Sequence, residues 1–220
     1  SPPGGGDEQI ADANTVALYH FNSDYNDASA NQLHLSIGGS VLLSADNLGW
    51  METPAGQVAR FGEIGDTLSV AIPDNLMLVA GDTRPVTIEA RIYPRSWLGY
   101  GFANLSIITL DQDWDTNLTL EDSKWGSTPK GPSILSAGIP ITTESQWATV
   151  APLGEWAQLQ ISFDGNSTVS AWINGQAAGS VALTPNVDRN NDWVLTIGNF
   201  DGDIDELYLH RSAPSATSQS

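Results

Sequence analysis

Short runs of alternating or β-branched residues, separated by Gly, Pro, Asn and Asp, make up most of this chain. Such runs predict strands rather than helices. Sustained helical spacing of apolar residues is missing, and only a short helical turn is expected, within 72–82. The predicted strands cover residues 15–21, 33–37, 57–62, 67–72, 86–94, 105–111, 117–121, 132–137, 156–164, 168–175, 178–183, 193–199 and 203–210. This pattern favours an all-β fold, a two-sheet antiparallel β-sandwich of the jelly-roll kind.

The clearest local unit is a meander of three antiparallel strands between residues 156 and 183. Asp164-Gly165-Asn166 joins the first two strands, and Asn174-Gly175 joins the second strand to the third. Asn-Gly favours a tight hairpin because both turn residues must adopt positive φ. In the first strand, Ala157, Leu159, Ile161 and Phe163 are expected to face the core, with Trp156, Gln158, Gln160 and Ser162 on the other face.

The charge balance is strongly acidic, with 26 Asp and Glu against 8 Lys and Arg and a formal net charge of −18. Nucleic acid binding needs clustered Lys and Arg on phosphates, and anionic lipid surfaces need the same. The composition therefore argues against both classes of partner. It favours divalent cations and neutral partners, or simply solubility in a salty medium.

The composition also bounds the architecture. A chain of 220 residues is long enough for one large all-β domain with its own core. It contains no cysteine, so neither disulfides nor thiolate metal sites are expected. No apolar run approaches the roughly 20 residues that span a bilayer, so membrane insertion is not expected. The domain is predicted over residues 9–211, between a Pro/Gly-rich linker at 1–8 and a linker or tail at 212–220.

Several phrases follow one another in a familiar order. They are ALYHFNSDYNDASANQLHLSIGG (17–39), ARFGEIGDTLSVAI (59–72), RPVTIEARIYP (84–94), LGEWAQLQISFDGNSTVSAWINGQ (153–176), LTIGN (195–199) and GDIDELYLH (202–210). Together they resemble the laminin-G-like branch of the concanavalin A-like lectin/glucanase superfamily, in its bacterial jelly-roll form. The resemblance implies two sheets packed face to face, one of them concave, with the first and last strands adjacent. The superfamily includes lectin-like modules, adhesion modules and enzymes, so the fold alone does not decide function.

The resemblance also implies a structural Ca²⁺, with Asp24, Asp27, Asn31 and Asp205 as the matching ligands. A short loop supplies several oxygen ligands, and a distant Asp205 can complete the shell if the terminal strands pair. The alternative is that Asp24 and Asp27 are ordinary turn residues.

GDIDELYLH raises a further question, because Asp203 and Asp205 stand two residues apart on one strand. That spacing puts two carboxylates on one face roughly 6 to 7 Å apart, near the separation of about 5 to 5.5 Å in retaining glycosidases. Related glucanases carry a Glu at each end of their motif, however, and the leading Glu is missing here. We therefore expect a closing strand without catalytic residues.

The candidate ligand site lies between residues 96 and 150, where aromatic residues gather near acidic ones. Indole rings stack on the apolar face of a sugar ring, and Asp and Asn side chains bind its hydroxyls. Trp156, Trp172 and Trp193 are expected to be structural, and a structural role is also expected for His20 and His210, which could meet on adjacent strands. The predicted ligand-binding residues are Trp97, Tyr100, Trp114, Trp125, Asp111, Asp113, Asp115 and Asn117.

These features predict a non-catalytic, calcium-stabilised module that binds a glycan or polysaccharide. We expect it to belong to a larger secreted or surface protein, extracellular and bacterial. One alternative is an adhesion module that binds a protein or peptide through its loops. The other is a glycosidase or polysaccharide lyase on the same fold, for which acid and base groups would have to converge in one groove.

Overall fold

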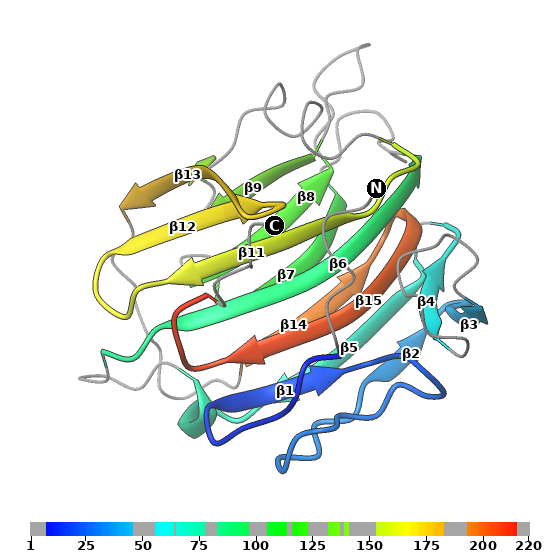
Figure 1. Cartoon of the computed structure of the whole chain (residues 1–220), viewed down its shortest axis with the longest axis horizontal. Helices are drawn as coiled ribbons and strands as arrows, with labels where there is room; N and C mark the ends of the chain where they lie inside the picture. The colour runs from blue at the N-terminus through cyan, green and yellow to red at the C-terminus, as the bar shows by residue number, and fades with distance from the viewer. Residues whose placement is uncertain are drawn as a thin grey trace.

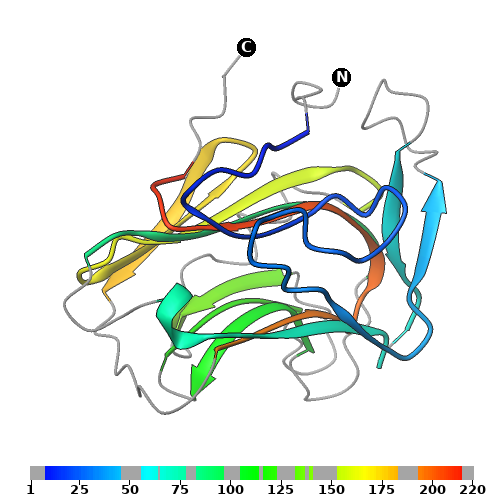
Figure 2. The same cartoon turned by 90° about the horizontal axis from the view of Figure 1, so that it is seen from below.

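The computed structural model describes residues 8–45, 56–63, 65–77, 83–96, 105–113, 116–122, 132–136, 139–140, 153–182 and 193–214. Fifteen strands and one short 3-10 helix form within these residues. The strands make two antiparallel sheets that stack face to face, as the edge-on view shows (Figures 1 and 2). The predicted all-β sandwich is therefore confirmed.

The larger sheet has eight strands and contains both the first and the last strand of the chain. Its order is β13 (Gln176–Ala182), β12 (Thr168–Ile173), β11 (Ala157–Phe163), β6 (Val86–Ser96), β15 (Asp201–His210), β4 (Gln57–Phe61) and β3 (Leu42–Ala45). β1 (Thr15–Tyr19) lies off this path and pairs with the second half of β15, from Leu207 to His210. The prediction that the first and last strands are adjacent is confirmed.

The smaller sheet has seven strands, with β7 and β14 near its centre. Its order is β10 (Ile139–Pro140), β9 (Pro132–Ser136), β8 (Thr116–Asp122), β7 (Leu105–Asp113), β14 (Trp193–Gly198), β5 (Thr67–Ile72) and β2 (Ser36–Gly38). The 3-10 helix, η1 (Asp74–Leu76), follows β5 where a helical turn was expected. β3 and β10 were not predicted, because each is too short for alternation to show.

The core lies between the sheets and is filled by alternate residues of each strand. On β11, Ala157, Leu159, Ile161 and Phe163 belong to this core, as expected from the meander. Asn174 and Gly175 adopt φ of 51° and 73°, so the Asn-Gly hairpin also forms as predicted. Thus the local turn chemistry and the period-2 pattern together place β11, β12 and β13 correctly.

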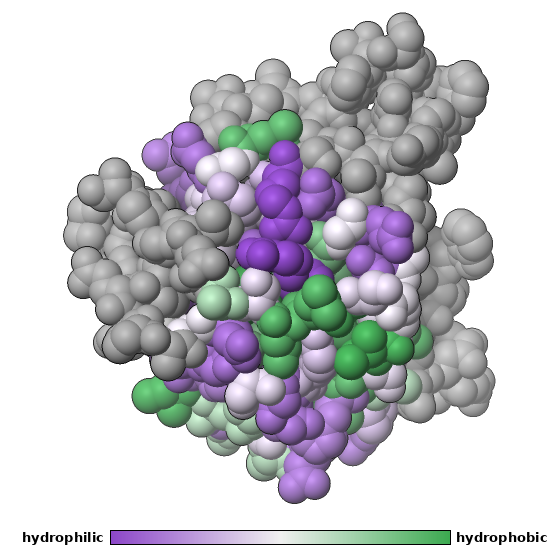
Figure 3. All heavy atoms as spheres, turned by 90° about the vertical axis from the view of Figure 1, so that its right-hand side faces the viewer, coloured by the Kyte–Doolittle hydropathy of each residue, from purple (hydrophilic) through white to green (hydrophobic). Residues whose placement is uncertain are grey.

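Both sheets end on the same side of the molecule, at the edge strands β2 and β3. This side shows hydrophobic residues among hydrophilic ones (Figure 3). Ile37 on β2 and Leu42 on β3 are 54% and 63% exposed. The two edge strands have only three and four residues, and such short edges limit pairing with other chains.

Candidate functional site

The outer face of the eight-stranded sheet is closed to solvent along its central strands. The buried polar residues on it are Thr87, Glu89 and Arg91 of β6, Gln160 and Ser162 of β11, and Asp203, Asp205 and His210 of β15. Thr87 Oγ1 lies 2.8 Å from Ser162 Oγ and donates to the Ser212 carbonyl at 2.7 Å. Polar side chains on this face therefore bind one another and the C-terminal segment, which leaves no open ligand surface over these strands.

The carboxylates of GDIDELYLH belong to this closed layer. Asp203 is fully buried, and its Oδ1 accepts hydrogen bonds from Arg60 Nε at 2.8 Å and Arg95 Nη1 at 2.7 Å. Asp205 is 3% exposed and accepts from the Glu206 N–H. Two carboxyls in these surroundings do not line a cleft that a glycosidic bond could enter. GDIDELYLH forms most of β15, an interior strand of the eight-stranded sheet that pairs with β6, β4 and β1.

The outer face of the seven-stranded sheet, in contrast, is open along β14, β5 and β2, the strands of this sheet whose side chains the structure describes. Val194, Thr196, Ser69, Ala71 and Ser36 lie on adjacent strands of this face, and we call these five residues the outer platform. All five are at least partly exposed, and Val194 is 42% exposed. None carries a charge or a side chain larger than valine, although the chain has a net charge of −18. The platform is therefore flat and neutral within an acidic protein.

The strand register extends this platform in a row of hydroxyl residues. Ser36 stands opposite Ser69, and Ser69 stands opposite Thr196. On the other side of Thr196 the row continues through Thr109 to Thr119. This row could not be predicted from the sequence, because the alternating Ser and Thr positions align only when the pairing of five strands is known.

Three predicted ligand-binding residues lie on strands of the same sheet, and two of them occupy the next row. Asp111 stands opposite Asn117 on β8 and opposite the exposed Val194 on β14. Asp113 stands opposite Thr116. Asp111 and Asp113 thus lie within strand β7, which extends two residues beyond the predicted strand at 105–111. The other predicted residues, Trp97, Tyr100, Trp114, Asp115 and Trp125, lie outside the described residues.

The predicted calcium ligands in the 24–31 loop cover the free edge of β1. Asp27 is buried and accepts hydrogen bonds from Leu18 N at 2.9 Å, Ser29 N at 2.8 Å, Ser29 Oγ at 2.7 Å and Leu33 N at 2.9 Å. Asn31 Nδ2 donates to the carbonyls of Thr15 and Val16. These bonds satisfy backbone groups that no neighbouring strand would otherwise pair.

The hydrogen bonds of this loop limit how the same residues could bind Ca²⁺. Both oxygens of Asp27 already accept protein hydrogen bonds, and the exposed Asp24 accepts from Asn26 N and Nδ2. Across the part of the chain that the structure describes, no three His, Cys, Asp or Glu side chains gather as a metal site. The residues as arranged here do not form a calcium cage, and calcium binding stays a prediction.

The two histidines on the terminal strands do not meet, because β1 and β15 run antiparallel. Thr15 pairs with His210, which leaves His20 at the far end of β1. His210 is buried, lies 3.0 Å from Glu89 Oε1 and stacks on Tyr208 at 4.3 Å between ring centroids. His20 Nδ1 lies 2.9 Å from Glu206 Oε1. This hydrogen bond raises the pKa of His20 above its ordinary value, against the opposing effect of burial.

The tryptophans that were expected to be structural occupy three different environments. Trp193 is 2% exposed in the main core. Trp156 is buried in a small separate cluster with Val58 and Tyr93. Trp172 on β12 is half-buried.

A laminin G-type family model, described as the concanavalin A-like lectin/glucanases superfamily, matches residues 65–218. The match covers more than half of the chain and agrees with the two stacked sheets. The chain belongs to the concanavalin A-like lectin/glucanases superfamily. No curated protein matches the sequence significantly.

Solved structures of this superfamily fold resemble the domain over nearly its whole length. Domain 4 of AbnA, a GH43 extracellular arabinanase from Geobacillus stearothermophilus in complex with arabinotriose, is 19% identical, with 94% of this chain and 98% of that chain covered and a TM-score of 0.64. The binding domain of botulinum neurotoxin DC in complex with SialylT is 14% identical, with 93% and 49% covered and a TM-score of 0.62.

The same toxin domain in complex with rat synaptotagmin II is 14% identical, with 94% of this chain and 50% of that chain covered and a TM-score of 0.64. The domain thus spans about half of those toxin chains. At these identities the likeness shows the fold. Among the described residues, no helix has the length and apolar character needed to cross a membrane.

Proposed function

We propose that this domain is a non-catalytic carbohydrate-recognition module that binds a neutral, extended glycan on the outer face of its seven-stranded sheet. The observation that carries the proposal is the contrast between the two outer faces. One is a closed layer of paired polar residues, and the other presents the uncharged, exposed outer platform. Domain 4 of the arabinanase, which has this fold, was solved with arabinotriose.

The platform suits a sugar chain for a physical reason. Adjacent strands lie about 4.8 Å apart, so the row from Ser36 to Thr196 offers hydroxyl groups at regular steps across the sheet. Hydroxyls donate and accept hydrogen bonds, as sugar hydroxyls do. Asp111 stands in the next row, opposite Asn117, and would bind hydroxyls more strongly, because its carboxylate makes charge-assisted hydrogen bonds.

The charge of the domain narrows the class of glycan. A net charge of −18 repels uronic acids and sulfated sugars at low salt. A neutral polysaccharide avoids this repulsion. We place the module outside the cell, in a larger protein, where such polymers occur.

The test compares two arginine variants by glycan-array binding and titration calorimetry. Ser69→Arg places a long cation in the middle of the platform, and Ser180→Arg places the same side chain on exposed β13 of the other sheet. Both variants should keep the wild-type melting temperature within a few degrees. Affinity should fall at least tenfold, or about 1.4 kcal/mol, in the first variant and stay unchanged in the second. Equal affinities would place the glycan elsewhere, and no binding to any glycan would reject the proposal.

A second candidate function is protein recognition, favoured by the exposed apolar residues at the edge formed by β2 and β3. Ile37 and Leu42 are more than half exposed there, and exposed apolar surface marks protein interaction sites when it is continuous. The toxin domain of the same fold was solved with rat synaptotagmin II. Leu42→Lys should weaken a protein complex and leave glycan affinity unchanged.

A further inference from the structure

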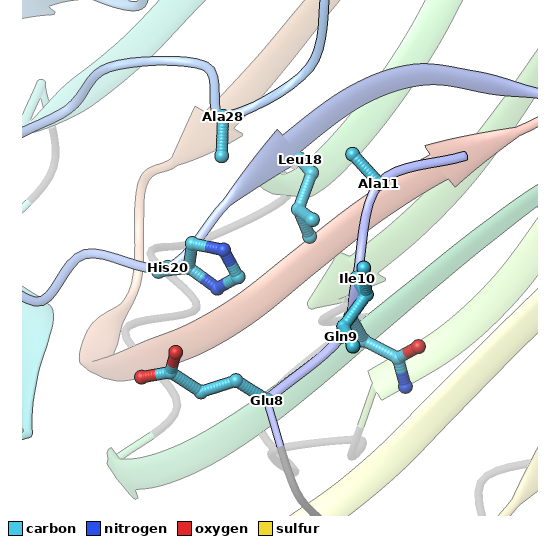
Figure 4. Close-up of a pocket in the computed structure, with 7 residues that line it drawn as sticks. All are labelled: Glu8, Gln9, Ile10, Ala11, Leu18, His20 and Ala28. Atoms are coloured by element: carbon cyan, nitrogen blue, oxygen red, sulfur yellow. The ribbon is translucent and has the colours of Figure 1, made fainter. Parts of the chain in front are cut away.

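Residues 8–14 lie on the outer side of β1 before the chain enters that strand, and we call them the strap (Figures 1 and 4). At its first end, Gln9 N–H donates to Glu206 Oε2 at 3.1 Å, and Asn22 Nδ2 donates to Glu8 Oε1 at 2.5 Å. Between the ends, Ile10 is 85% exposed. The strap is therefore held at its ends while its middle stays open to water.

The second end of the strap is tied to both terminal strands. Asp12 N–H donates to Thr15 Oγ1 at 2.7 Å, and Arg211 N–H donates to the Asn14 carbonyl at 2.8 Å. Between the strap and β1 lies a shallow depression of about 630 Å³. Residues 8–11 line one side of it, and Leu18, His20 and Ala28 line the other (Figure 4). The strap thus forms one wall of a depression whose opposite wall belongs to the sandwich.

Glu206 reaches the strap because of a bulge in β15. The register of β15 against β6 shifts between Asp205 and Tyr208, and Glu206 adopts a φ of 48°. Phe21, which follows His20 in the chain, is also buried and has a φ of 58°. Left-handed backbone is unfavourable for side chains of this size and persists only where contacts enforce it. Bulges re-aim side chains, and this one directs a carboxylate at His20 and at the strap.

The net charge around Glu206 depends on whether His20 is protonated. Glu206 is 2% exposed in its side chain and lies 2.9 Å from His20 Nδ1. Glu8 on the strap and Asp205 on β15 add negative charge near the imidazole, and Arg91 on β6 stands opposite Asp205 in the register. A protonated His20 offsets the carboxylates of Glu206 and Glu8. Once His20 is neutral, these two carboxylates repel each other across a partly buried site.

We propose that the strap is releasable, that Glu206 is its latch, and that loss of the His20 proton opens it and uncovers the Leu18 side of the depression. The strap is closed where His20 is protonated and opens as the pH rises through the pKa of His20. The raised pKa of His20 places the transition above pH 6.5, the ordinary value. The device controls access to the side of β1 that faces away from the sandwich core.

A thiol reporter tests the latch, because the chain contains no cysteine. Ala11→Cys puts a single thiol on the half-buried part of the strap, and its maleimide reactivity is divided by that of the exposed Ser180→Cys. Gln9→Pro removes the N–H that Glu206 accepts. Ile10→Pro is the matched control, since it places the same ring one residue later and leaves the Gln9 N–H intact.

In the Ala11→Cys background, Gln9→Pro should raise the normalised reactivity about tenfold at pH 6, the scale of one hydrogen bond to a charged group. Ile10→Pro should change it by less than about threefold, because that hydrogen bond is kept. The parent should become more reactive from pH 6 to pH 9, and His20→Gln should be equally reactive at both. If Gln9→Pro and Ile10→Pro give equal normalised reactivities, the strap end frays in both variants and Glu206 is not its latch. If the normalised reactivity of the Ala11→Cys parent does not change between pH 6 and pH 9, His20 does not control the strap.

Discussion

Asp203 and Arg60 form a two-pronged ion pair between β15 and β4, with 2.8 Å from Nε to Oδ1 and 3.0 Å from Nη2 to Oδ2. Asp203 is fully buried and also accepts from Arg95 Nη1. Asp203→Ala should therefore lower the free energy of unfolding by about 1.5–3 kcal/mol, because the charge-assisted hydrogen bonds from two partly exposed guanidinium groups are lost. Urea unfolding followed by fluorescence measures the change.

The matched control for this prediction is Asp201→Ala. Asp201 also pairs with Arg95, at 2.8 Å, but its side chain is 27% exposed. Exposed pairs contribute at most about 1 kcal/mol. A loss at Asp201 as large as that at Asp203 would contradict the importance given to burial.

Asp27 and Asp24 lie three residues apart in one loop and should respond differently to substitution. Asp27→Ala leaves the buried Leu18 and Ser29 N–H groups and the partly buried Leu33 N–H without an acceptor, which should cost about 2–4 kcal/mol of unfolding free energy. Asp24 is exposed, so Asp24→Ala should change stability by less than about 0.5 kcal/mol. Chemical unfolding of both variants distinguishes a structural hub from a turn residue. Similar losses would be inconsistent with the hydrogen-bond assignment.

Calcium binding can be tested separately from the hydrogen-bonding role of Asp27. If Asp24, Asp27, Asn31 and Asp205 bind Ca²⁺, calcium at a hundred times its dissociation constant should stabilise the domain by about 2.7 kcal/mol. Asp24→Asn should lose this gain, since it keeps the hydrogen bonds of Asp27 and removes one charged ligand. Differential scanning calorimetry with calcium and with chelator gives the answer. Identical melting temperatures in the two solutions would exclude calcium as a stabilising ligand.

The lowered pKa of Asp66 predicts how the free energy of unfolding depends on pH. Burial raises the pKa of Asp66, but hydrogen bonds from the N–H groups of Ser40, Gly62 and Glu63 outweigh it, so the pKa falls below 3.8. A folded-state pKa below the unfolded value contributes stability above pH 3.8 that is lost as pH falls through the folded pKa. The stability advantage of wild type over Asp66→Asn should therefore shrink between pH 5 and pH 3. Urea unfolding at both pH values measures it, and a constant difference would contradict this origin.

Local patterns were sufficient for most of the fold. The alternation of Ala157, Leu159, Ile161 and Phe163 located a strand and its buried face, and Asn174-Gly175 located a hairpin. Such features depend on neighbours in the chain, so sequence spacing reports them directly. The pairing of the first and last strands came from the resemblance to a known superfamily, because no local signal encodes it.

The sequence by itself determined most of the segments that become strands and the residues that turn the chain, and it predicts that so acidic a domain favours neutral or cationic partners. Only the tertiary structure decided that Asp27 covers the edge of β1, that Glu206 faces His20, and that Ser36, Ser69 and Thr196 align in one row. The physical reason is register. A shift of one residue moves every side chain to the other face, and a single bulge re-aims a carboxylate. Both depend on contacts between residues far apart in the chain.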